Sequence, residues 1–340
     1  MNVDLSTRYL GLNLANPLGV SAGPLSGRLD TLRQLQDAGA SVAVLPSLFE
    51  EQIRHEEQEI HRLYENQAES FAESLSYFPE LEDYNTGPTG YLKYLDAAKR
   101  AVSMPLIGSL NGCSQSGWIR YAKAIQNAGA DALELNIYFV PTVPIVTSAD
   151  VEKRYVHLVA EVCQSVSIPV AVKIGQNFSS LPHFAAQLVK AGASGLVLFN
   201  RYLEADIDIE SLSFKPDLVL SNRHEARVPI RWIAILRDQI RASLAATGGV
   251  HRTQGVIKLL LAGADVTLMT SVLLIKGPNF LRTLLVELSC WLEEHEYSSV
   301  QQLKGSMSRG NCPDPGALER ANYMQALTNY SSHHGAPYSQ

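Results

Sequence analysis

The chain has 340 residues, of which 46% are hydrophobic and 18% are charged, and its formal net charge is −6. This balance is typical of a large folded domain and argues against partners such as nucleic acid or an anionic membrane surface. We expect no secretory leader and no membrane span, because no apolar stretch approaches the roughly 20 residues that a span requires. The four cysteines are widely spaced and form no Cys-x-x-Cys pair. We therefore expect reduced thiols, a cytoplasmic protein and no metal site.

The tripeptide Ala-Gly-Ala occurs four times, beginning at Ala38, Ala128, Ala191 and Ala262. Each copy follows a helix-like stretch and precedes a short apolar run. A glycine just beyond a helix can take the left-handed conformation that reverses the chain, and a short run rich in Val, Leu and Ala is typical of a buried parallel strand. The repetition predicts stacked βα units of the α/β class, closed as a TIM (βα)8 barrel.

Eight strands are predicted in chain order, over residues 18–22, 41–45, 105–110, 132–136, 169–174, 195–200, 243–247 and 266–270. Residues 5–16 are predicted to form an N-terminal hairpin that could plug the barrel bottom. The connections 46–90 and 201–229, insertions after strands 2 and 6, are too long for simple βα loops, and such loops are usually functional or carry their own structure. We predict one barrel domain over residues 1–298 and a helical tail packed on it over residues 299–340.

Small and polar residues stand at the predicted strand ends, where βα barrels place their chemistry. Ala22 and Gly23 end the first strand in a tight turn or in a surface that a flat ring could approach closely. Lys173 lies in an apolar strand, either as a cation facing a ligand or as a lysine at the barrel rim. Asn136 and Asn200 end two further strands, and each amide can donate and accept hydrogen bonds. Together these residues indicate a ligand site at the barrel mouth.

The last two predicted strands end in sequences that suit a phosphate group. Gly248 and Gly249 follow the seventh strand, and Thr270 and Ser271 follow the eighth. Backbone N–H groups after these two strands form the usual phosphate site of such barrels. The two motifs therefore predict that the ligand carries a phosphate.

These motifs resemble the dihydroorotate dehydrogenase family of FMN-dependent βα barrels. The similarity extends from residue 5 to about residue 294 and includes Tyr9-Leu10-Gly11-Leu12, Ser21-Ala22-Gly23, Glu134-Leu135-Asn136, Val170-Ala171-Val172-Lys173, Leu198-Phe199-Asn200 and Thr247-Gly248-Gly249-Val250. The resemblance implies an FMN cofactor, hydride transfer from a CH–CH group of a small-molecule substrate to the flavin, and a role in pyrimidine biosynthesis. It also implies an electron acceptor, which the sequence does not identify, and a homodimer.

The resemblance implies a role for each matching residue. Lys173 would contact the flavin near its reactive edge and would be a catalytic residue. The cofactor-binding residues would be Ala22, Gly23, Asn111, Asn136, Lys173, Asn200, Gly248, Gly249, Thr270 and Ser271. The substrate-binding residues would be Ser47, Asn85, Asn136 and Asn200.

The chain also departs from the family pattern, chiefly where the family carries its catalytic base, a Cys or Ser. That position falls on Phe139, and a substrate-binding Asn falls on Pro141. The family has a lysine after its second strand where this chain has Pro46, and it has glycines where this chain has Asn222 and Met269. Phenylalanine cannot accept a proton, so dihydroorotate is expected to be a poor substrate.

Other residues could take over the work of the missing base. Tyr138 is adjacent to it and could supply an O–H group as acid or base, unless it points into packing, since neighbouring strand residues face opposite ways. Ser47 and residues of the long insertion after the second strand are other candidates. Two other functions stay open: a flavin-binding accessory protein without turnover, and a flavin-free lyase that uses Lys173 to form a Schiff base. The segment 50–61 opens like the zinc motif His-Glu-x-x-His but has Glu59 in place of the second histidine, so a solvated acidic helix near the mouth is expected there.

Overall fold

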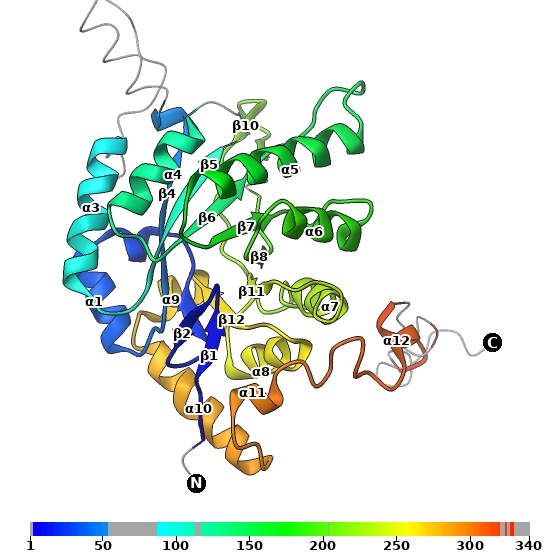
Figure 1. Ribbon diagram of the computed structural model, residues 1–340. Coiled ribbons are helices and arrows are strands. Elements are labelled where there is room, and N and C mark those ends of the chain that lie inside the picture. Colours follow the sequence, from blue (N-terminus) through cyan, green and yellow to red (C-terminus); the bar gives the residue numbers. More distant parts are fainter. Residues whose placement is uncertain are drawn as a thin grey trace, which may run out of the picture.

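The computed structural model describes residues 3–53, 87–112, 117–202, 204–319, 324 and 327–329. Its centre is a closed barrel of eight parallel strands (Figure 1). In order around the barrel they are β3 (Leu18–Val20), β4 (Ala43–Phe49), β5 (Leu106–Gly112), β6 (Ala132–Ile137), β7 (Val170–Ile174), β8 (Gly195–Leu198), β11 (Ser243–Thr247) and β12 (Val266–Met269). Pairing of β12 with β3 closes the barrel. The predicted TIM (βα)8 fold and its eight strands are confirmed.

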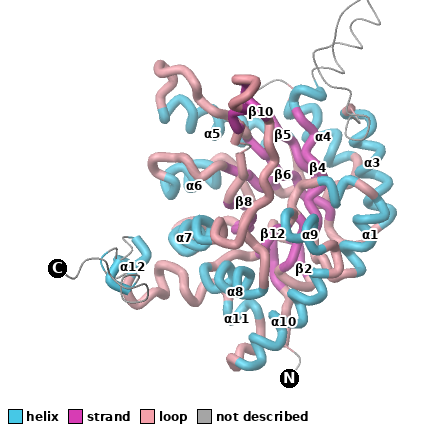
Figure 2. Tube along the Cα trace, turned by 180° about the vertical axis from the view of Figure 1, so that it is seen from behind, coloured by secondary structure: helices cyan, strands magenta, loops and turns pink. Residues whose placement is uncertain are grey.

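Helices form an outer layer around the strands in both views (Figures 1 and 2). They are η1 (Pro24–Gly27), α1 (Leu29–Asp37), α3 (Pro88–Ala101), α4 (Trp118–Asn127), α5 (Ser148–Ser165), α6 (Leu181–Lys190), α7 (Arg227–Leu236), α8 (Thr253–Ala262), α9 (Ser271–Lys276) and α10 (Phe280–Glu294). Their apolar faces pack on the outward side chains of the strands and form the larger hydrophobic core. In the described part of the chain, no helix combines the length and the apolar character needed to cross a bilayer.

The barrel interior is filled from below by the N-terminal hairpin. Strands β1 (Thr7–Tyr9) and β2 (Leu12–Leu14) pair antiparallel, as predicted. Tyr9, Leu10 and Leu14 are buried in a second hydrophobic cluster together with inward side chains of the barrel strands. Because the hairpin closes the lower end, a ligand can enter the barrel from the opposite, C-terminal end of the strands.

The four Ala-Gly-Ala copies end four helices in the same way. Their glycines, Gly39, Gly129, Gly192 and Gly263, have φ between +92° and +120°. The alanine that follows each glycine donates its N–H to the carbonyl five residues earlier, as in Ala40 to Leu35 at 2.9 Å. This is the bond pattern of a Schellman cap. The next residue donates to the start of the preceding strand, as in Asp265 N to Leu244 O at 2.7 Å. Each copy therefore joins a helix end to the barrel.

The ends of several strands differ from prediction: β3 ends two residues earlier than predicted, at Val20, and β5 ends two residues later, at Gly112. The second strand was predicted to end at Leu45, but β4 continues to Phe49. Proline has no N–H for a sheet, and Pro46 is tolerated because the β4–β5 register shifts between Val44 and Ser47. Strand β8 ends at Leu198, two residues earlier than predicted.

The long connection after β8 lies on the mouth side of the barrel, where several of its residues line a cavity. The connection after β8 carries its own antiparallel hairpin, β9 (Asp206–Asp208) and β10 (Ser213–Lys215), which agrees with the expectation that so long a loop has structure of its own. Of the connection after β4, residues 54–86 lie outside the described residues. The predictions for Asn85 and for most of the acidic segment 50–61 fall there.

Residues 300–309, after α10, pack against the bottom of the barrel, with backbone N–H groups of Gly305, Met307 and Arg309 bonded to α8 and α7. The chain after α10 contains α11 (Val300–Leu303) and α12 (Pro315–Glu319), the latter at the edge of the molecule in Figures 1 and 2. Lys304 Nζ lies 2.8 Å from Asp265 Oδ1, and Arg237 lies 3.2 Å from the same oxygen. The other oxygen, Oδ2, accepts the backbone N–H of Leu244 at 2.8 Å. Asp265 thus connects the tail segment, α7 and strand β11.

Replacing Asp265 with alanine is expected to destabilise the fold strongly. The side chain of Lys304 is 4% exposed, and it would be left as a buried charge without this carboxylate. Losing one partner of a buried ion pair typically costs about 3–5 kcal/mol. Urea denaturation would measure the loss. The matched control is Asp131→Ala, because Asp131 also follows an Ala-Gly-Ala and pairs with Lys99, but with side chains 28% and 29% exposed. We expect about 1–2 kcal/mol there, and equal losses would contradict the argument.

Candidate functional site

A cavity of about 1100 Å3 opens at the C-terminal ends of the barrel strands. Ligand pockets are usually about 300–1000 Å3, so this one has room for more than one small molecule. It is lined by every predicted site residue that the structure describes, namely Ala22, Gly23, Ser47, Asn111, Asn136, Tyr138, Lys173, Asn200, Gly248, Gly249, Thr270 and Ser271. Residues from all eight barrel strands, or from the loops directly after them, therefore meet in one cavity, although they are spread over 250 residues of sequence.

Three adjacent strands present polar side chains side by side in the cavity. Asn111 of β5 is in register with Asn136 of β6, which is in register with Lys173 of β7. Residues in register on neighbouring parallel strands point to the same side of the sheet. The result is a row of two amides and one cation on the cavity wall.

Lys173 is buried at 7% exposure, which excludes the interpretation as a lysine at the solvated rim. Its Nζ donates to Ser21 Oγ at 3.4 Å and lies 3.7 Å from Glu134 Oε1. Burial raises the pKa of the Glu134 carboxyl, and the attraction of Lys173 opposes that shift. At 3.7 Å the contact is an ion pair without a good hydrogen bond. The ammonium therefore keeps N–H donors for a group in the cavity.

The two predicted mouth amides contact each other. Asn200 Nδ2 donates to Asn136 Oδ1 at 2.7 Å. An amide has one carbonyl oxygen and two N–H donors, so this bond leaves the NH2 group of Asn136 and the oxygen of Asn200 for a ligand. The pair can therefore offer a donor and an acceptor to the edge of a planar heterocycle.

The residue after β6 that faces the cavity is Tyr138, whereas Phe139 turns away. Phe139 packs against the main core, with the guanidinium carbon of Arg154 4.5 Å from its ring centroid. The ring centroids of Tyr138 and Tyr202 lie 4.3 Å apart, and both residues line the cavity. The hydroxyl of Tyr202 is 3.5 Å from that of Tyr155. Burial raises the pKa of Tyr202. The aromatic pair forms a wall with hydroxyl groups where the family pattern has a base.

Ser47 belongs to a small hydrogen-bonded group at the ends of β4 and β5. Its Oγ lies 2.8 Å from Ser109 Oγ, and the backbone N–H of Ser109 donates to the hydroxyl of Tyr91 at 3.0 Å. Ser47 also lines the cavity. A hydroxyl held by another hydroxyl still has lone pairs to offer, so Ser47 can contact a small molecule here.

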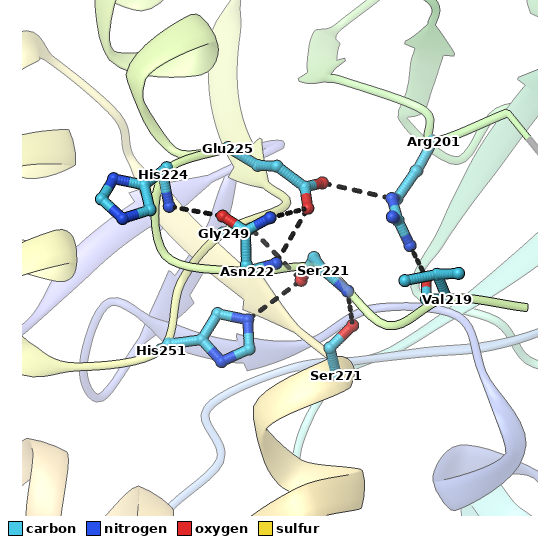
Figure 3. Close-up of polar contacts among 9 residues, drawn as sticks. All are labelled: Arg201, Val219, Ser221, Asn222, His224, Glu225, Gly249, His251 and Ser271. Carbon is cyan, nitrogen blue, oxygen red and sulfur yellow. Dashed lines mark hydrogen bonds and ion pairs between the residues drawn. The ribbon is translucent and has the colours of Figure 1, made fainter.

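The opposite end of the cavity is formed by the loops after β11 and β12 (Figure 3). Gly248 and Gly249 both have positive φ, +89° and +74°. Ser221, from the long connection, joins the two loops: its N–H donates to Ser271 Oγ at 3.1 Å, and its Oγ accepts the N–H of Gly249 at 3.5 Å. His251 Nε2 lies 3.1 Å from the same Oγ. Figure 3 shows Gly249 and His251 at the hydroxyl of Ser221 and Ser271 at its backbone nitrogen.

The first strand end meets the last at this end of the cavity. A Cβ atom at Gly23 would lie 2.7 Å from Thr270 Cγ2, and Thr270 Oγ1 donates to Ser21 O at 3.1 Å. The absence of a side chain at Gly23 therefore lets Thr270 approach, in addition to leaving room for a ligand.

Sequence reasoning missed Ser221, His251 and Tyr202 as site residues. The available signals were the serine of a turn that otherwise departs from the family, at Leu220-Ser221-Asn222, and the histidine directly after Gly248-Gly249-Val250. Tyr202 had no signal beyond its place two residues after Asn200.

Comparison with known proteins agrees with this geometry. The family model for dihydroorotate dehydrogenase matches residues 4–292. A Thermoplasma acidophilum protein named dihydroorotate dehydrogenase B (NAD(+)), catalytic subunit, is 24% identical over 313 residues, which cover 89% of this chain and 98% of the relative. A protein of the same name from Bacillus mycoides is 27% identical over 248 residues, covering 69% of this chain and 75% of the relative. The chain therefore belongs to the dihydroorotate dehydrogenase family, whose members are flavin-dependent oxidoreductases that act on CH–CH groups.

Proposed function

We propose that this chain is an FMN-dependent oxidoreductase that removes hydrogen from a CH–CH bond of a small planar substrate other than dihydroorotate. The observation that supports it most is the meeting of Lys173, the Asn136–Asn200 pair and the Gly248–Gly249 turn in one cavity. A cation, a set of amides and an open glycine turn are the groups that a flavin ring with a phosphate tail requires.

The residues present fit FMN. No atom lies within 4 Å of the position that a Cβ would take at Gly248, so the turn is open toward the cavity. Its backbone and the hydroxyl groups of Ser271 and Ser221 would hold the phosphate. Lys173 and the two amides lie deeper in the barrel mouth and would hold the ring. Bound FMN would supply the acceptor for the hydride.

The chain's own residues would then serve three purposes. Lys173 places a buried positive charge where the ring gains negative charge, a stabilisation that grows as water is excluded. Asn136 and Asn200 orient a heterocycle through their remaining donor and acceptor. Tyr138 has its hydroxyl-bearing ring on the cavity wall beside Tyr202, so we assign it the proton transfer at the substrate carbon.

A second candidate function is flavin binding without turnover, in the service of another redox protein. Two observations favour this second function. The family's base position holds Phe139, which cannot accept a proton, and its ring packs against Arg154. The two functions share the flavin site and differ only in whether a substrate reduces the flavin.

An absorbance spectrum of the purified protein, followed by FMN titration, tests the shared part. We expect a yellow protein with one FMN per chain, and a colourless protein that binds no added FMN would refute the proposal. Anaerobic stopped-flow mixing with planar CH–CH substrates then separates the two functions. Bleaching of the flavin supports the oxidoreductase, and Tyr138→Phe should slow that bleaching. A flavin that no substrate reduces supports the accessory role.

Lys173→Ala is expected to weaken FMN binding or to lower the flavin reduction potential. The lost charge-assisted contact is worth on the order of 1–3 kcal/mol, which is roughly fivefold to a hundredfold in the dissociation constant. The single variant also leaves Glu134 as a buried carboxyl without its cation. The control is therefore Lys173→Gln with Glu134→Gln, which keeps a neutral pair. Unchanged affinity and potential in both variants would show that Lys173 does not face the flavin.

A further inference from the structure

The hydrogen bonds around the loops after β11 and β12 converge on one residue, Ser221, and two of them reach its hydroxyl group. The side chain is 9% exposed and lines the cavity. Its backbone N–H is held by Ser271 and its Oγ by the N–H of Gly249. A serine tied to the loops after both β11 and β12 stands between the two places where these barrels bind phosphate.

His251 is the second neighbour of this hydroxyl, with Nε2 3.1 Å from Oγ (Figure 3). It is only partly exposed and does not line the cavity. His251 therefore contacts a ligand only through Ser221.

We propose that His251 is a positioning residue whose proton decides whether the Ser221 hydroxyl donates to the phosphate of the bound cofactor. The inference rests on the proposed FMN binding and adds a residue that no motif of the family assigned. The ligand chemistry is that of a phosphate monoester, here the tail of FMN.

Counting donors and acceptors shows why the proton matters. A serine hydroxyl has one hydrogen and two lone pairs, and one lone pair accepts the N–H of Gly249. If Nε2 of His251 has no hydrogen, it accepts the serine O–H, and the remaining lone pair of Oγ would meet the anionic phosphate. If Nε2 carries a hydrogen, it donates to the second lone pair. The serine O–H is then free to donate to a phosphate oxygen, and a charged imidazolium adds attraction.

The surroundings of His251 set the direction of the pH dependence. Burial lowers the pKa of His251, Ser221 and the Glu225 carboxylate raise it, and the Lys276 ammonium lowers it. With its pKa below the ordinary 6.5, the imidazole is mostly neutral at pH 7 in the free protein. A phosphate dianion favours the protonated form and therefore raises this pKa on binding. By linkage, binding takes up protons, and FMN affinity increases as the pH falls.

The test compares FMN with riboflavin, which has the same ring and no phosphate, by fluorescence titration between pH 6.5 and 8.5. If the phosphate raises the pKa of His251 by about one unit, the FMN dissociation constant should rise about three- to fivefold across this range, because the free imidazole is already at least half neutral at pH 6.5. Riboflavin should show no such change. The phosphate's own second pKa of about 6 lies below the range. Equal pH dependence for the two ligands would overturn the inference, and this comparison needs no variant.

His251→Gln assigns the effect to the residue. Glutamine retains an N–H donor but does not titrate, so this change in FMN affinity with pH should disappear while binding persists. Calorimetry in two buffers of different ionisation enthalpy should show less proton uptake than in the unchanged protein. His224→Gln is the matched control. His224 lies three residues after Ser221 and contacts Asn222 and Arg223 (Figure 3). The His224→Gln variant should keep the full pH dependence of FMN binding.

The outcomes separate this inference from the proposed function. FMN binding whose pH dependence is the same in the unchanged protein and in His251→Gln overturns the role of His251 and leaves the flavin site intact. Failure to bind FMN at any pH overturns both. A pH dependence present with FMN, absent with riboflavin and lost only in His251→Gln supports the inference.

Discussion

Gly249→Asp will abolish FMN binding. A Cβ atom at this position would lie 2.2 Å from the backbone N of Ala226 and 2.9 Å from the carbonyl carbon of Glu225. Both neighbours are backbone atoms, so the segment carrying Ser221 must move away from the turn. The residue also has φ +74°, which strains any L side chain. The new carboxylate would in addition repel a phosphate dianion at the site. Titration with FMN at 450 nm and a thermal melt would measure the loss of binding and the retention of the fold.

Gly11→Asp provides the matched control. Gly11 also has a positive φ, +81°, but nothing lies within 4 Å of its Cβ position. It stands in the β1–β2 hairpin at the closed end of the barrel, so the same change in charge occurs far from the mouth. FMN affinity should stay within about twofold. If Gly249→Asp binds FMN as well as Gly11→Asp does, the phosphate does not sit at this turn.

Dihydroorotate will be at best a poor substrate. General base catalysis is typically worth 10²–10⁴-fold, and the family's base position is Phe139, whose ring packs against Arg154. The measurement is anaerobic mixing of the FMN-loaded protein with dihydroorotate. Enzymes ordinarily turn over at ~10 s⁻¹, and we expect the rate of flavin bleaching to be lower than this by the factor that the base contributes. Rapid bleaching would show that another residue, with Tyr138 or Ser47 as the first candidates, has taken over the proton.

Two cysteine variants test where a base must stand in this barrel. Tyr138→Cys would place a thiol on the cavity wall, whereas Phe139→Cys would place it beside Arg154, outside the cavity. Only the first should increase the rate with dihydroorotate. A gain with Phe139→Cys alone would mean that the segment after β6 rearranges when substrate binds.

The strands could be located from sequence because helix end, glycine turn and buried strand repeat as one unit. The φ values of Gly39, Gly129, Gly192 and Gly263 show that the same local geometry recurs at each copy. Most of the residues that line the cavity could then be predicted from the strand ends, since parallel strands in a barrel bring their C-terminal residues to one mouth. Local sequence was sufficient to predict a feature wherever the contact that produces it lies within one βα unit.

Contacts between distant segments could not be predicted. Tyr138 lies two residues after Asn136 and faces the same cavity, as strand alternation gives, so its orientation could have been predicted, whereas its contact with Tyr202 could not. Ser221 reaches the Gly249 turn only because a hairpin of the connection after β8 returns the chain to the mouth. The extension of β4 past Pro46 required a register shift against β5, which depends on the partner strand.

The ion pairs of Asp265 lie at the end of the barrel opposite the cavity. Residues that hold the molecule together and residues that would perform its chemistry are therefore largely different sets, at different ends of the same strands. Side chains at the mouth of such a barrel can therefore change with little effect on folding stability. Such separation makes the barrel permissive to new substrates. It also suggests a practical order for engineering: strengthen the closed end first, then vary the mouth.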